Sequence, residues 1–503
     1  MRASVIVVAC FFLLGFGDVE AGALIVHNLS SAPASCTVDG YDHDTPVKPF
    51  SVPPGSMLRL PIPASTQMID HVTCGGKLHT RGMHITAKGP DGTLYLNGKQ
   101  TRTLNVLLYA FIPTDPTVGY SPLLQALTLK YQSANPSVLL NLVLNPDIDT
   151  YDFGTLSNQV MGPNGYDVAE LDTVFLTYLA SNGLITPVTV NGDAPIDVGK
   201  QAATIGTTLY GVPSWLCSDF AFSFNGKLAS VASVSQLQNV LNPPPSGGVP
   251  LVADFDGSWT IPAMYLQAYL QTYGPQKFAA LRGAAATPTI DPADPAIISL
   301  MTTGASLCAA GNSDLCTNGY YHHAKDGTVE QVFATGYANG DAGFSERSFF
   351  IAYYENNPHP LTMIPFPWGS GPRLVYSDAF VTNKVRCSTD PCSSDSTAFT
   401  AWATSADIKA YIAFSGDLPS GSQPRHLLTA TQPFWKLPAV QSDPIYSQVA
   451  STLFAGTMYP YLNLFTPELQ YGLLSQLCPA VKASAPSWVC KVPSPPPSQK
   501  SGN

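Results

Sequence analysis

Residues 210–223, YGVPSWLCSDFAFS, hold the side chain with the most open chemistry in this sequence, the thiol of Cys217. A cysteine can be half of a disulfide, a small buried hydrophobic residue or, as a thiolate, a nucleophile. A nucleophilic cysteine usually works beside a histidine or a carboxylate that takes its proton. The choice therefore depends on the compartment and on the partners that the rest of the chain offers.

The amino-terminal residues predict that the protein is secreted. Arg2 precedes an apolar run over residues 5–16 and a small-residue site at residues 19–21. This is typical of a signal peptide over residues 1–21, with cleavage expected after Ala21 or Ala23. No later stretch has the roughly 18 uninterrupted apolar residues of a membrane span. We therefore expect a soluble extracellular protein whose thiols tend to pair. Asn28, in the one Asn-x-Ser/Thr sequon without proline, is a candidate glycan site.

The cysteine count predicts one unpaired thiol. Of the ten cysteines, Cys10 leaves with the signal peptide, so nine remain, an odd number. Proximity groups eight of them into local couples and leaves Cys217 over: Cys36 with Cys74, Cys308 with Cys316, Cys387 with Cys392, and Cys478 with Cys490. Spacing does not fix connectivity, and both a buried core thiol and a nucleophile remain open for Cys217.

Composition narrows the partners. The 503 residues are 45% apolar, enough for a large core and more than one domain. Only 12% are charged, and the net charge is −10. Nucleic-acid binding needs clustered Lys and Arg, so this balance disfavours it, whereas a cationic small molecule suits it better.

Two sequence patterns divide the chain into an amino-terminal part and a larger remainder. Short strands broken by Pro- and Gly-rich turns predict a small all-β domain over residues 22–100. From residue 101 strands alternate with helices; an apolar strand in 105–113, for example, precedes a helix that starts at Ser121-Pro122. This alternation predicts an α/β structure with a mainly parallel sheet and a ligand cleft between two halves. The Pro- and Ser-rich residues 491–503 predict a disordered tail.

Carboxylates are better candidates than histidines to accept the proton of Cys217. The nearest histidines in sequence, His84 and His322, belong to no recognisable motif, and no G-x-S-x-G motif of a serine hydrolase occurs. Glu346 follows a Gly-rich turn at the start of an aromatic run, and Asp378 lies at the end of an apolar strand.

Six segments, in this order, resemble thiaminase I, also called thiamine pyridinylase, a family of secreted enzymes built like two-lobed type 2 periplasmic binding proteins. They are LLYAFIPTD, NPDIDTYDF, YDVAELDTVFL, LYGVPSWLCSDFAF, GFSERSFF and LVYSDAF. The resemblance implies a two-lobed α/β fold of that type, with a central cleft, over residues 101–490. The expected amino-terminal β domain lies outside it.

Carried over by position, the resemblance implies that Cys217 adds to carbon 6 of the aminopyrimidine ring of thiamine. Glu346 is then the general base that activates Cys217 and later deprotonates the incoming nucleophile, while Asp172 and Asp378 hold the aminopyrimidine by hydrogen bonds. Cleavage at the pyrimidine methylene exchanges the thiazole for an organic base or a thiol, without a metal or cofactor. We expect a monomer acting on small molecules, with no nucleic-acid or membrane partner. The residues implied to line the cleft are Tyr109, Tyr151 and Tyr376.

Plainer interpretations stand beside these roles. Asp172 is also well placed to cap a helix beginning near Thr173, and the tyrosines suit ordinary half-buried positions. Phe111 and Phe344 stand where the family pattern has tyrosine, a difference that bears on substrate preference and rate. The rival function is a secreted solute-binding protein on the same fold, which has no use for an unpaired thiol facing a carboxylate. A cysteine hydrolase is disfavoured because no motif places a histidine.

Overall fold

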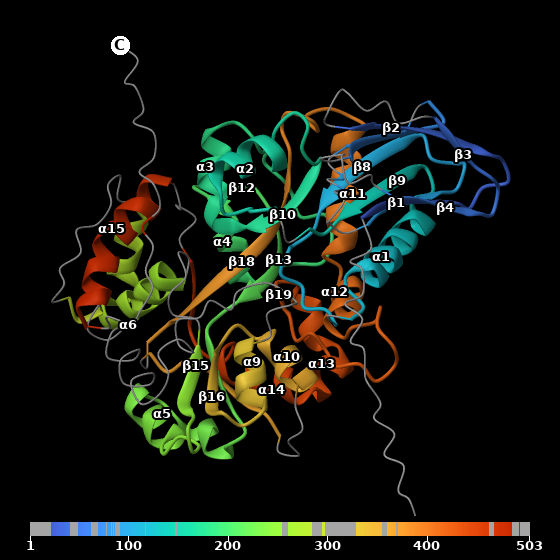
Figure 1. Cartoon of the computed structure of the whole chain (residues 1–503). Helices are drawn as coiled ribbons and strands as arrows, with labels where there is room; N and C mark the ends of the chain where they lie inside the picture. The colour runs from blue at the N-terminus through green and yellow to red at the C-terminus, as the bar shows by residue number, and fades with distance from the viewer. Residues whose placement is uncertain are drawn as a thin grey trace, which may run out of the picture. The chain divides into compact units, whose positions relative to one another are not determined.

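The computed structural model describes residues 22–40, 49–61, 69–76, 78–81, 83, 85, 91–115, 117–145, 148–253, 260–283, 294–296, 328–354, 360–368, 371–461, 467–484 and 492. The chain divides into two compact units, residues 1–98 and residues 99–503 (Figure 1). The expected signal peptide, the expected tail apart from Val492, and the thiols of Cys308, Cys316 and Cys490 lie outside the described residues.

The described elements of the first unit are all strands. They form one sheet in the order β4-β1-β7 and another in the order β3-β2-β5-β6. The disulfide between Cys36 and Cys74 joins directly opposed residues of β2 and β5, as their proximity in sequence predicts. The strands are β1 Ala23–Asn28, β2 Ala34–Gly40, β3 Phe50–Val52, β4 Met57–Pro61, β5 Ile69–Cys74, β6 Leu78–Thr80 and β7 Gly92–Leu96.

Asn28 is a poor glycan site, so the sequence-based expectation for it is wrong. Its side chain is fully buried, and its amide nitrogen donates to the carbonyl oxygens of Ala32 and Val52, each at 2.8 Å. A glycan is attached through this same nitrogen and needs solvent around it. In the folded protein Asn28 instead fixes the turn that follows β1.

The larger sheet of the second unit has the order β19-β13-β18-β10-β8-β9, with β20 paired to β18. Strands β8, β9 and β10 are mutually parallel, but β18 runs antiparallel to both β10 and β13. The expected mainly parallel sheet is therefore mixed, because β18 arrives from far along the chain and inserts at its centre (Figure 1). The strands are β8 Arg102–Leu107, β9 Val138–Val143, β10 Val168–Asp172, β13 Val212–Cys217, β18 Arg373–Thr382, β19 Leu428–Thr429 and β20 Met458–Pro460.

A second sheet has the order β15-β16-β14-β17. The chain passes from the first sheet to the second through Ser218 and Asp219, directly between β13 and β14, and returns between β17 and β18. The two crossings are tied together, because the amide of Phe366 donates to the carbonyl of Asp219 at 2.8 Å. Cys217 thus ends β13 at the point where the chain leaves one sheet for the other. The strands are β14 Phe220–Ser223, β15 Val249–Ala253, β16 Ala338–Gly343 and β17 Thr362–Pro365, and the short pair β11 Thr204–Ile205 and β12 Thr208–Leu209 stands apart.

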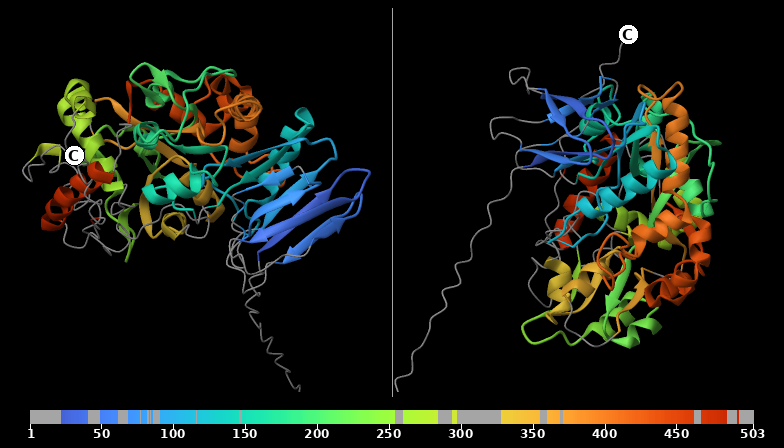
Figure 2. Two further views of the ribbon diagram at one scale, coloured as in Figure 1. Left: turned by 90° about the horizontal axis from the view of Figure 1, so that it is seen from above. Right: turned by 90° about the vertical axis from the view of Figure 1, so that its right-hand side faces the viewer.

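Helices pack beside these sheets. The predicted helix at Ser121-Pro122 is confirmed as α1, with proline in its first turn. Helix α15 lies beside α6 in the views of Figures 1 and 2. No described helix has both the length and the apolar character needed to cross a membrane. The helices are α1 Ser121–Ala134, α2 Phe153–Thr155, α3 Leu176–Ser181, α4 Asp197–Ala202, α5 Val234–Leu241, α6 Thr260–Gly283, α9 Thr328–Ala334, α10 Arg347–Tyr354, α11 Cys392–Ala403, α12 Ala406–Ala413, α13 Pro438–Ser442, α14 Pro444–Thr452 and α15 Pro467–Ser484.

Candidate active site

Strand register brings the candidate residues together. Cys217, at the end of β13, lies opposite Tyr376 of β18. Two residues further along β18, Asp378 lies directly opposite Asp172, the last residue of β10. All four are buried, and Cys217 and Asp378 are only 4% and 3% exposed. Neighbouring strands from distant parts of the chain thus gather a thiol and two carboxyl groups in one place.

The two aspartates lie directly opposite each other on the neighbouring strands β10 and β18, and like charges in such positions destabilise each other. Burial raises the pKa of Asp172 to about 7. The pKa of Asp378 rises well above its usual range, first because of burial and then because Asp172 lies opposite. Two buried carboxyl groups this close do not both ionise readily, so near neutral pH the pair retains a proton. It can therefore offer a hydrogen-bond donor as well as acceptors.

Asp172 is also the helix cap that its position predicts. Its Oδ1 accepts from the amide of Val174 at 3.1 Å, at the start of the 3₁₀-helix η2 (Thr173–Phe175). Its Oδ2 accepts from the hydroxyl of Tyr151 at 3.3 Å. The two interpretations of Asp172 are compatible, because capping engages one oxygen and fixes the orientation of the other.

Cys217 has a free thiol, whereas Cys387 and Cys392 form the predicted disulfide and Cys478 is disulfide-bonded as well. Burial raises the pKa of the Cys217 thiol well above its usual value, and the nearby carboxyl of Glu346 raises it further. A hydrogen bond with Tyr109 acts in the opposite direction and favours the thiolate. The resting group is therefore a neutral thiol that needs a proton acceptor before it can attack.

Glu346 is suited to that role. It is buried in the turn that leads into α10, and burial raises the pKa of its carboxyl to about 7, although Arg347 opposes the shift. A base whose pKa lies near the working pH transfers protons efficiently in both directions. The turn is fixed by hydrogen bonds from the Ser348 hydroxyl to the Ser345 carbonyl at 2.8 Å and from the Phe349 amide to the Glu346 carbonyl at 3.0 Å.

Aromatic rings flank the cluster on two sides. Tyr109 packs edge-on against Phe111 with ring centroids 5.1 Å apart, and Phe111 lies 6.0 Å from Tyr151. On the other side Phe344 lies 5.6 Å from Tyr376. Both phenylalanines therefore contact tyrosines of the candidate site. They supply flat apolar surface for an aromatic ligand but no hydroxyl group to bind it.

The sequence interpretation missed two residues at this site. Asp219 is largely buried, and burial raises the pKa of its carboxyl to about 6. The ring of Tyr461 packs against the ring of Tyr376, with the centroids 4.9 Å apart and the planes tilted by 49°. The position of Asp219, two residues after Cys217 at a strand end, was a usable signal. Tyr461 had none, because its neighbour in space comes from a distant part of the sequence.

A second arrangement, the chain Ser348–His426–Asp443, has the residue types of a hydrolase triad. The Ser348 hydroxyl lies 2.8 Å from His426 Nδ1, and His426 Nε2 lies 3.3 Å from Asp443 Oδ2. However, Ser348 is buried inside α10 and already donates its proton to the Ser345 carbonyl. Its oxygen is therefore not free to attack, and the chain anchors α10 close to Glu346.

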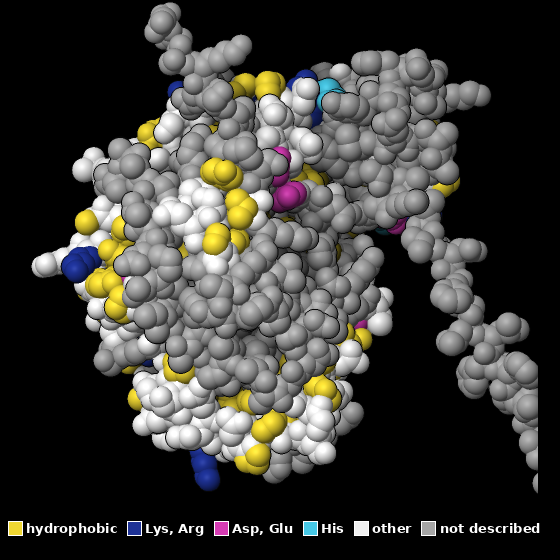
Figure 3. All heavy atoms as spheres, turned by 60° about the vertical axis from the view of Figure 1, so that its left-hand side comes forward, with side chains coloured by type: hydrophobic (Ala, Val, Ile, Leu, Met, Phe, Trp, Pro, Cys, Tyr) yellow, Lys and Arg dark blue, Asp and Glu magenta, His cyan; other side chains and the backbone are white. Residues whose placement is uncertain are grey.

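The one group among the described residues with metal-ligand spacing is Asp167 with Cys387 and Cys392, and the two sulfurs form a disulfide. It therefore offers no thiolate pair. Charge also disfavours an anionic ligand at the candidate site, because its carboxyl groups outnumber nearby cations. On the face shown in Figure 3 the described Lys and Arg side chains are few and far apart.

No model of a known protein family and no curated protein sequence matches this chain. Solved structures do. Thiaminase I from Bacillus thiaminolyticus aligns with a TM-score of 0.58 and 21% identity, over 76% of this chain and 99% of that one. Clostridium botulinum thiaminase I in complex with thiamin aligns with a TM-score of 0.57 and 18% identity, over 76% of this chain and 99% of that one. Maltose-bound MalE3 of T. maritima aligns with a TM-score of 0.54 and 11% identity, over 77% of this chain and 95% of that one.

These matches confirm the predicted fold. About three quarters of the chain, 76% and 77% in these alignments, has the α/β architecture shared by thiaminase I and by sugar-binding proteins of the type 2 periplasmic-binding fold. At such identities the likeness concerns the fold, which serves enzymes and binding proteins alike. The chemistry must therefore be argued from the side chains around Cys217.

Proposed function

We propose that this protein is a secreted thiamine-degrading transferase that exchanges the thiazole of thiamine for another base or nucleophile. One observation carries the proposal: the free thiol of Cys217 lies buried among the carboxyl groups of Asp172, Asp378 and Glu346, whose pKa values are all raised. The fold shared with thiaminase I supports it.

Thiamine fits the charge and shape of this cluster. Its aminopyrimidine edge carries a donor, the amino group, beside an acceptor, the ring nitrogen. The Asp172–Asp378 pair, holding one proton, offers the complementary acceptor and donor. The positive thiazolium ring gains from nearby carboxylates and from the faces of tyrosines. The site residues proposed for binding are Tyr109, Tyr151, Asp172, Tyr376 and Asp378.

The proposed reaction uses the thiol and one base. The proton of Cys217 passes to Glu346 and on to solvent while Sγ bonds to carbon 6 of the pyrimidine. The electron pair moves through the ring and breaks the bond between the methylene and the thiazolium nitrogen, so the thiazole leaves neutral. An amine or thiol then adds to the methylene and gives its proton to Glu346. When the Sγ–C6 bond breaks, that proton returns to the Cys217 thiolate. Each turnover with such an acceptor thus releases one proton.

Product analysis tests this function. The protein is incubated with thiamine and an excess of pyridine or aniline, and the mixture is separated by chromatography. We expect free thiazole and the base-exchanged pyrimidine in equal amounts. The competing function, a solute-binding protein, is suggested by the matches to sugar-binding proteins. It predicts tight binding of thiamine with neither product, and that result would refute the transferase.

A further inference from the structure

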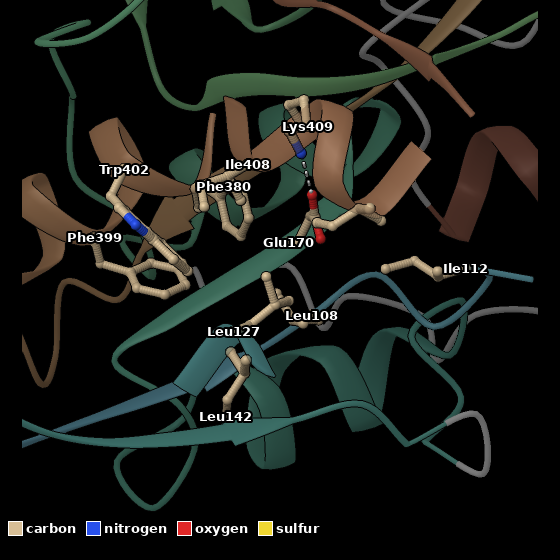
Figure 4. A pocket seen from close by; sticks show the side chains of 12 residues that line it. Leu108, Ile112, Leu127, Leu142, Glu170, Phe380, Phe399, Trp402, Ile408 and Lys409 are labelled. Carbon is tan, nitrogen blue, oxygen red and sulfur yellow. Dashed lines mark hydrogen bonds and ion pairs between the residues drawn. The ribbon is translucent and has the colours of Figure 1, made fainter. Parts of the chain in front are cut away.

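A buried ion pair lies close to the candidate site, since Glu170 is two residues before Asp172 on β10. Lys409 of α12 and Glu170 of β10 are each about 1% exposed at the side chain, and Lys409 Nζ lies 3.5 Å from Glu170 Oε1 (Figure 4). The cavity beside them is lined mainly by apolar side chains, among them Leu108, Phe380 and Trp402. Desolvation makes such a pair costly, so a buried pair seldom stabilises a fold on its own account. What the pair holds in place is the more informative question.

The pair sits in a fully engaged network. The Ser214 hydroxyl donates to Glu170 Oε1, and the Lys409 ammonium donates to the Ser214 oxygen. Lys409 Nζ also lies 3.6 Å from the centroid of the Trp215 ring, a cation–π distance. Ser214 and Trp215 belong to β13, the strand that ends at Cys217. The network therefore joins the strand that carries Glu170 to the strand that carries the thiol.

The second oxygen of Glu170 reaches the candidate site. Glu170 Oε2 accepts from the backbone amide of Tyr109 at 2.9 Å, two residues beyond the end of β8. The Tyr109 side chain in turn lies near Cys217 and lowers the pKa of its thiol, which favours the thiolate. Contacts thus run from Lys409 through Glu170 to Tyr109 and on to the thiol. Asp172 follows two residues after Glu170 on the same strand. Strand β10 therefore carries both the residue that holds the Tyr109 amide and one member of the Asp172–Asp378 pair.

We propose that Glu170, held in place by Lys409, is a positioning residue that fixes the segment carrying Tyr109 so that the Tyr109 hydroxyl meets the Cys217 thiol. This inference rests on the proposed function only in taking Cys217 as the reacting group. Glu170 contacts no substrate in this account and acts through the backbone of Tyr109.

Two other roles must be distinguished from positioning. The pair could act by charge, since Glu170 raises and Lys409 lowers the pKa of Asp378. It could also serve only to fasten α12 to the sheet. The double variant Glu170→Gln/Lys409→Met removes both charges but keeps an oxygen that can accept the Tyr109 amide. Glu170→Leu/Lys409→Met also removes both charges and loses that acceptor. Comparing the two separates positioning from charge.

The test measures the rate of alkylation of Cys217 by iodoacetamide in the native full chain at one mildly alkaline pH, with the modified peptide identified by mass spectrometry. A hydrogen bond to the thiolate favours the reactive form, so Tyr109→Phe should slow alkylation roughly tenfold. Glu170→Leu/Lys409→Met should slow it about as much, and Glu170→Gln/Lys409→Met no more than roughly threefold. Circular dichroism and thermal unfolding confirm that each variant is folded at the assay temperature.

Combining the changes gives the decisive comparison. The triple variant combines Glu170→Leu/Lys409→Met with Tyr109→Phe. If Glu170 acts through Tyr109, this triple variant is alkylated no more slowly than Tyr109→Phe alone, because the same contact is lost only once. Rates that multiply, or a Glu170→Leu/Lys409→Met variant that reacts as fast as wild type or faster, overturn the proposal. Equal slowing of the Gln and Leu double variants assigns the effect to charge and overturns it too. No thiamine is present, so a failure of the transferase proposal is seen separately in the exchange assay.

Discussion

Two sets of buried carboxyl groups in residues 99–503 are neutralised in different ways. Arg425 donates to both oxygens of Asp417, at 2.5 and 2.8 Å, and Arg347 Nη1 donates to Asp341 at 2.7 Å. These four side chains are at most 1% exposed. Around Cys217 the carboxyl groups are also buried, yet no ion pair of the described residues involves them. They are Asp172, Asp378 and Glu346.

The difference separates structural charge from functional charge. A buried carboxylate paired with arginine has its charge compensated within the fold, and removing either partner leaves the other charge buried and unpaired. A buried carboxyl group without such a partner keeps a raised pKa and can accept or donate a proton near neutral pH. The cluster around Cys217 therefore retains a capacity for proton transfer and for binding a cation. Burial raises the pKa of Asp341 as well, to about 6, but one of its oxygens is already engaged by Arg347.

Among the carboxyl groups near Cys217, replacing Glu346 should reduce the rate of thiazole release most. Glu346→Gln keeps the shape but removes the proton acceptor, and such assistance is typically worth about 10²–10⁴-fold in rate. We expect kcat for thiazole release to fall by that factor while the dissociation constant for thiamine changes little. Glu330→Gln, at a buried glutamate 3.7 Å from Arg347, is the matched control and should stay within about tenfold of wild type. Equal losses in both variants would contradict the distinction.

Breaking a structural pair should affect stability instead. Arg425→Met leaves Asp417 buried without its partner, and removing one member of a buried pair typically costs about 3–5 kcal/mol. Urea unfolding should show a loss of this size. At temperatures where the variant stays folded, the alkylation rate of Cys217 should match that of wild type. An unchanged free energy of unfolding would show that the pair is not structural.

Asp378→Asn should weaken binding. The amide replaces a group that can both accept and donate with one whose donor faces part of the aminopyrimidine edge, and a mismatched buried polar pair costs about 1–3 kcal/mol. Calorimetry should therefore show thiamine bound roughly ten- to a hundredfold less tightly. Binding equal to wild type would place the pyrimidine elsewhere.

The same substitution should stabilise the fold at neutral and higher pH, a smaller effect of opposite sign. Below about pH 4 Asp378 is protonated in both the folded and the unfolded chain, so it contributes no pH dependence. Above that pH the unfolded chain ionises freely, whereas the raised pKa of Asp378 opposes ionisation in the folded chain, and wild type loses stability. Asparagine does not ionise, so the variant should gain about 1–2 kcal/mol at about pH 8 and nothing at about pH 4. Asp417→Asn should lose stability at the higher pH, and a gain there would contradict the comparison.

The sequence predicted local features of the fold better than its long-range pairing. The helix at Ser121-Pro122 and the disulfide Cys387–Cys392 depend on residues close together in the chain, and the disulfide Cys36–Cys74 joins two paired strands of the same amino-terminal unit. The insertion of β18 between β10 and β13 was not predictable, because strand direction and order depend on contacts across the whole unit. Burial of Asn28 was missed for a similar reason: the two carbonyls it serves lie on different segments.

The candidate site shows the same division. The resemblance selected Cys217, Glu346, Asp172 and Asp378, and the strand register brings the thiol and both aspartates into one group. Glu170 and Lys409 were not predicted, because a lone buried ion pair leaves no pattern in sequence. The two residues lie 239 positions apart in the chain, and Glu170 reaches Tyr109 only through a backbone amide, so no local pattern of residue types marks either contact.

The most direct test of the central claim compares wild type with Cys217→Ser in thiamine exchange and in thiamine binding. A serine hydroxyl is a far weaker nucleophile than a thiolate, so initial rates of thiazole release should fall by roughly 10⁴-fold or more. The dissociation constant for thiamine, measured by calorimetry, should change by less than about tenfold, because the aspartates and tyrosines proposed to bind the ring remain. If Cys217→Ser releases thiazole at a rate near that of wild type, the thiol is not the reacting group and the account is wrong.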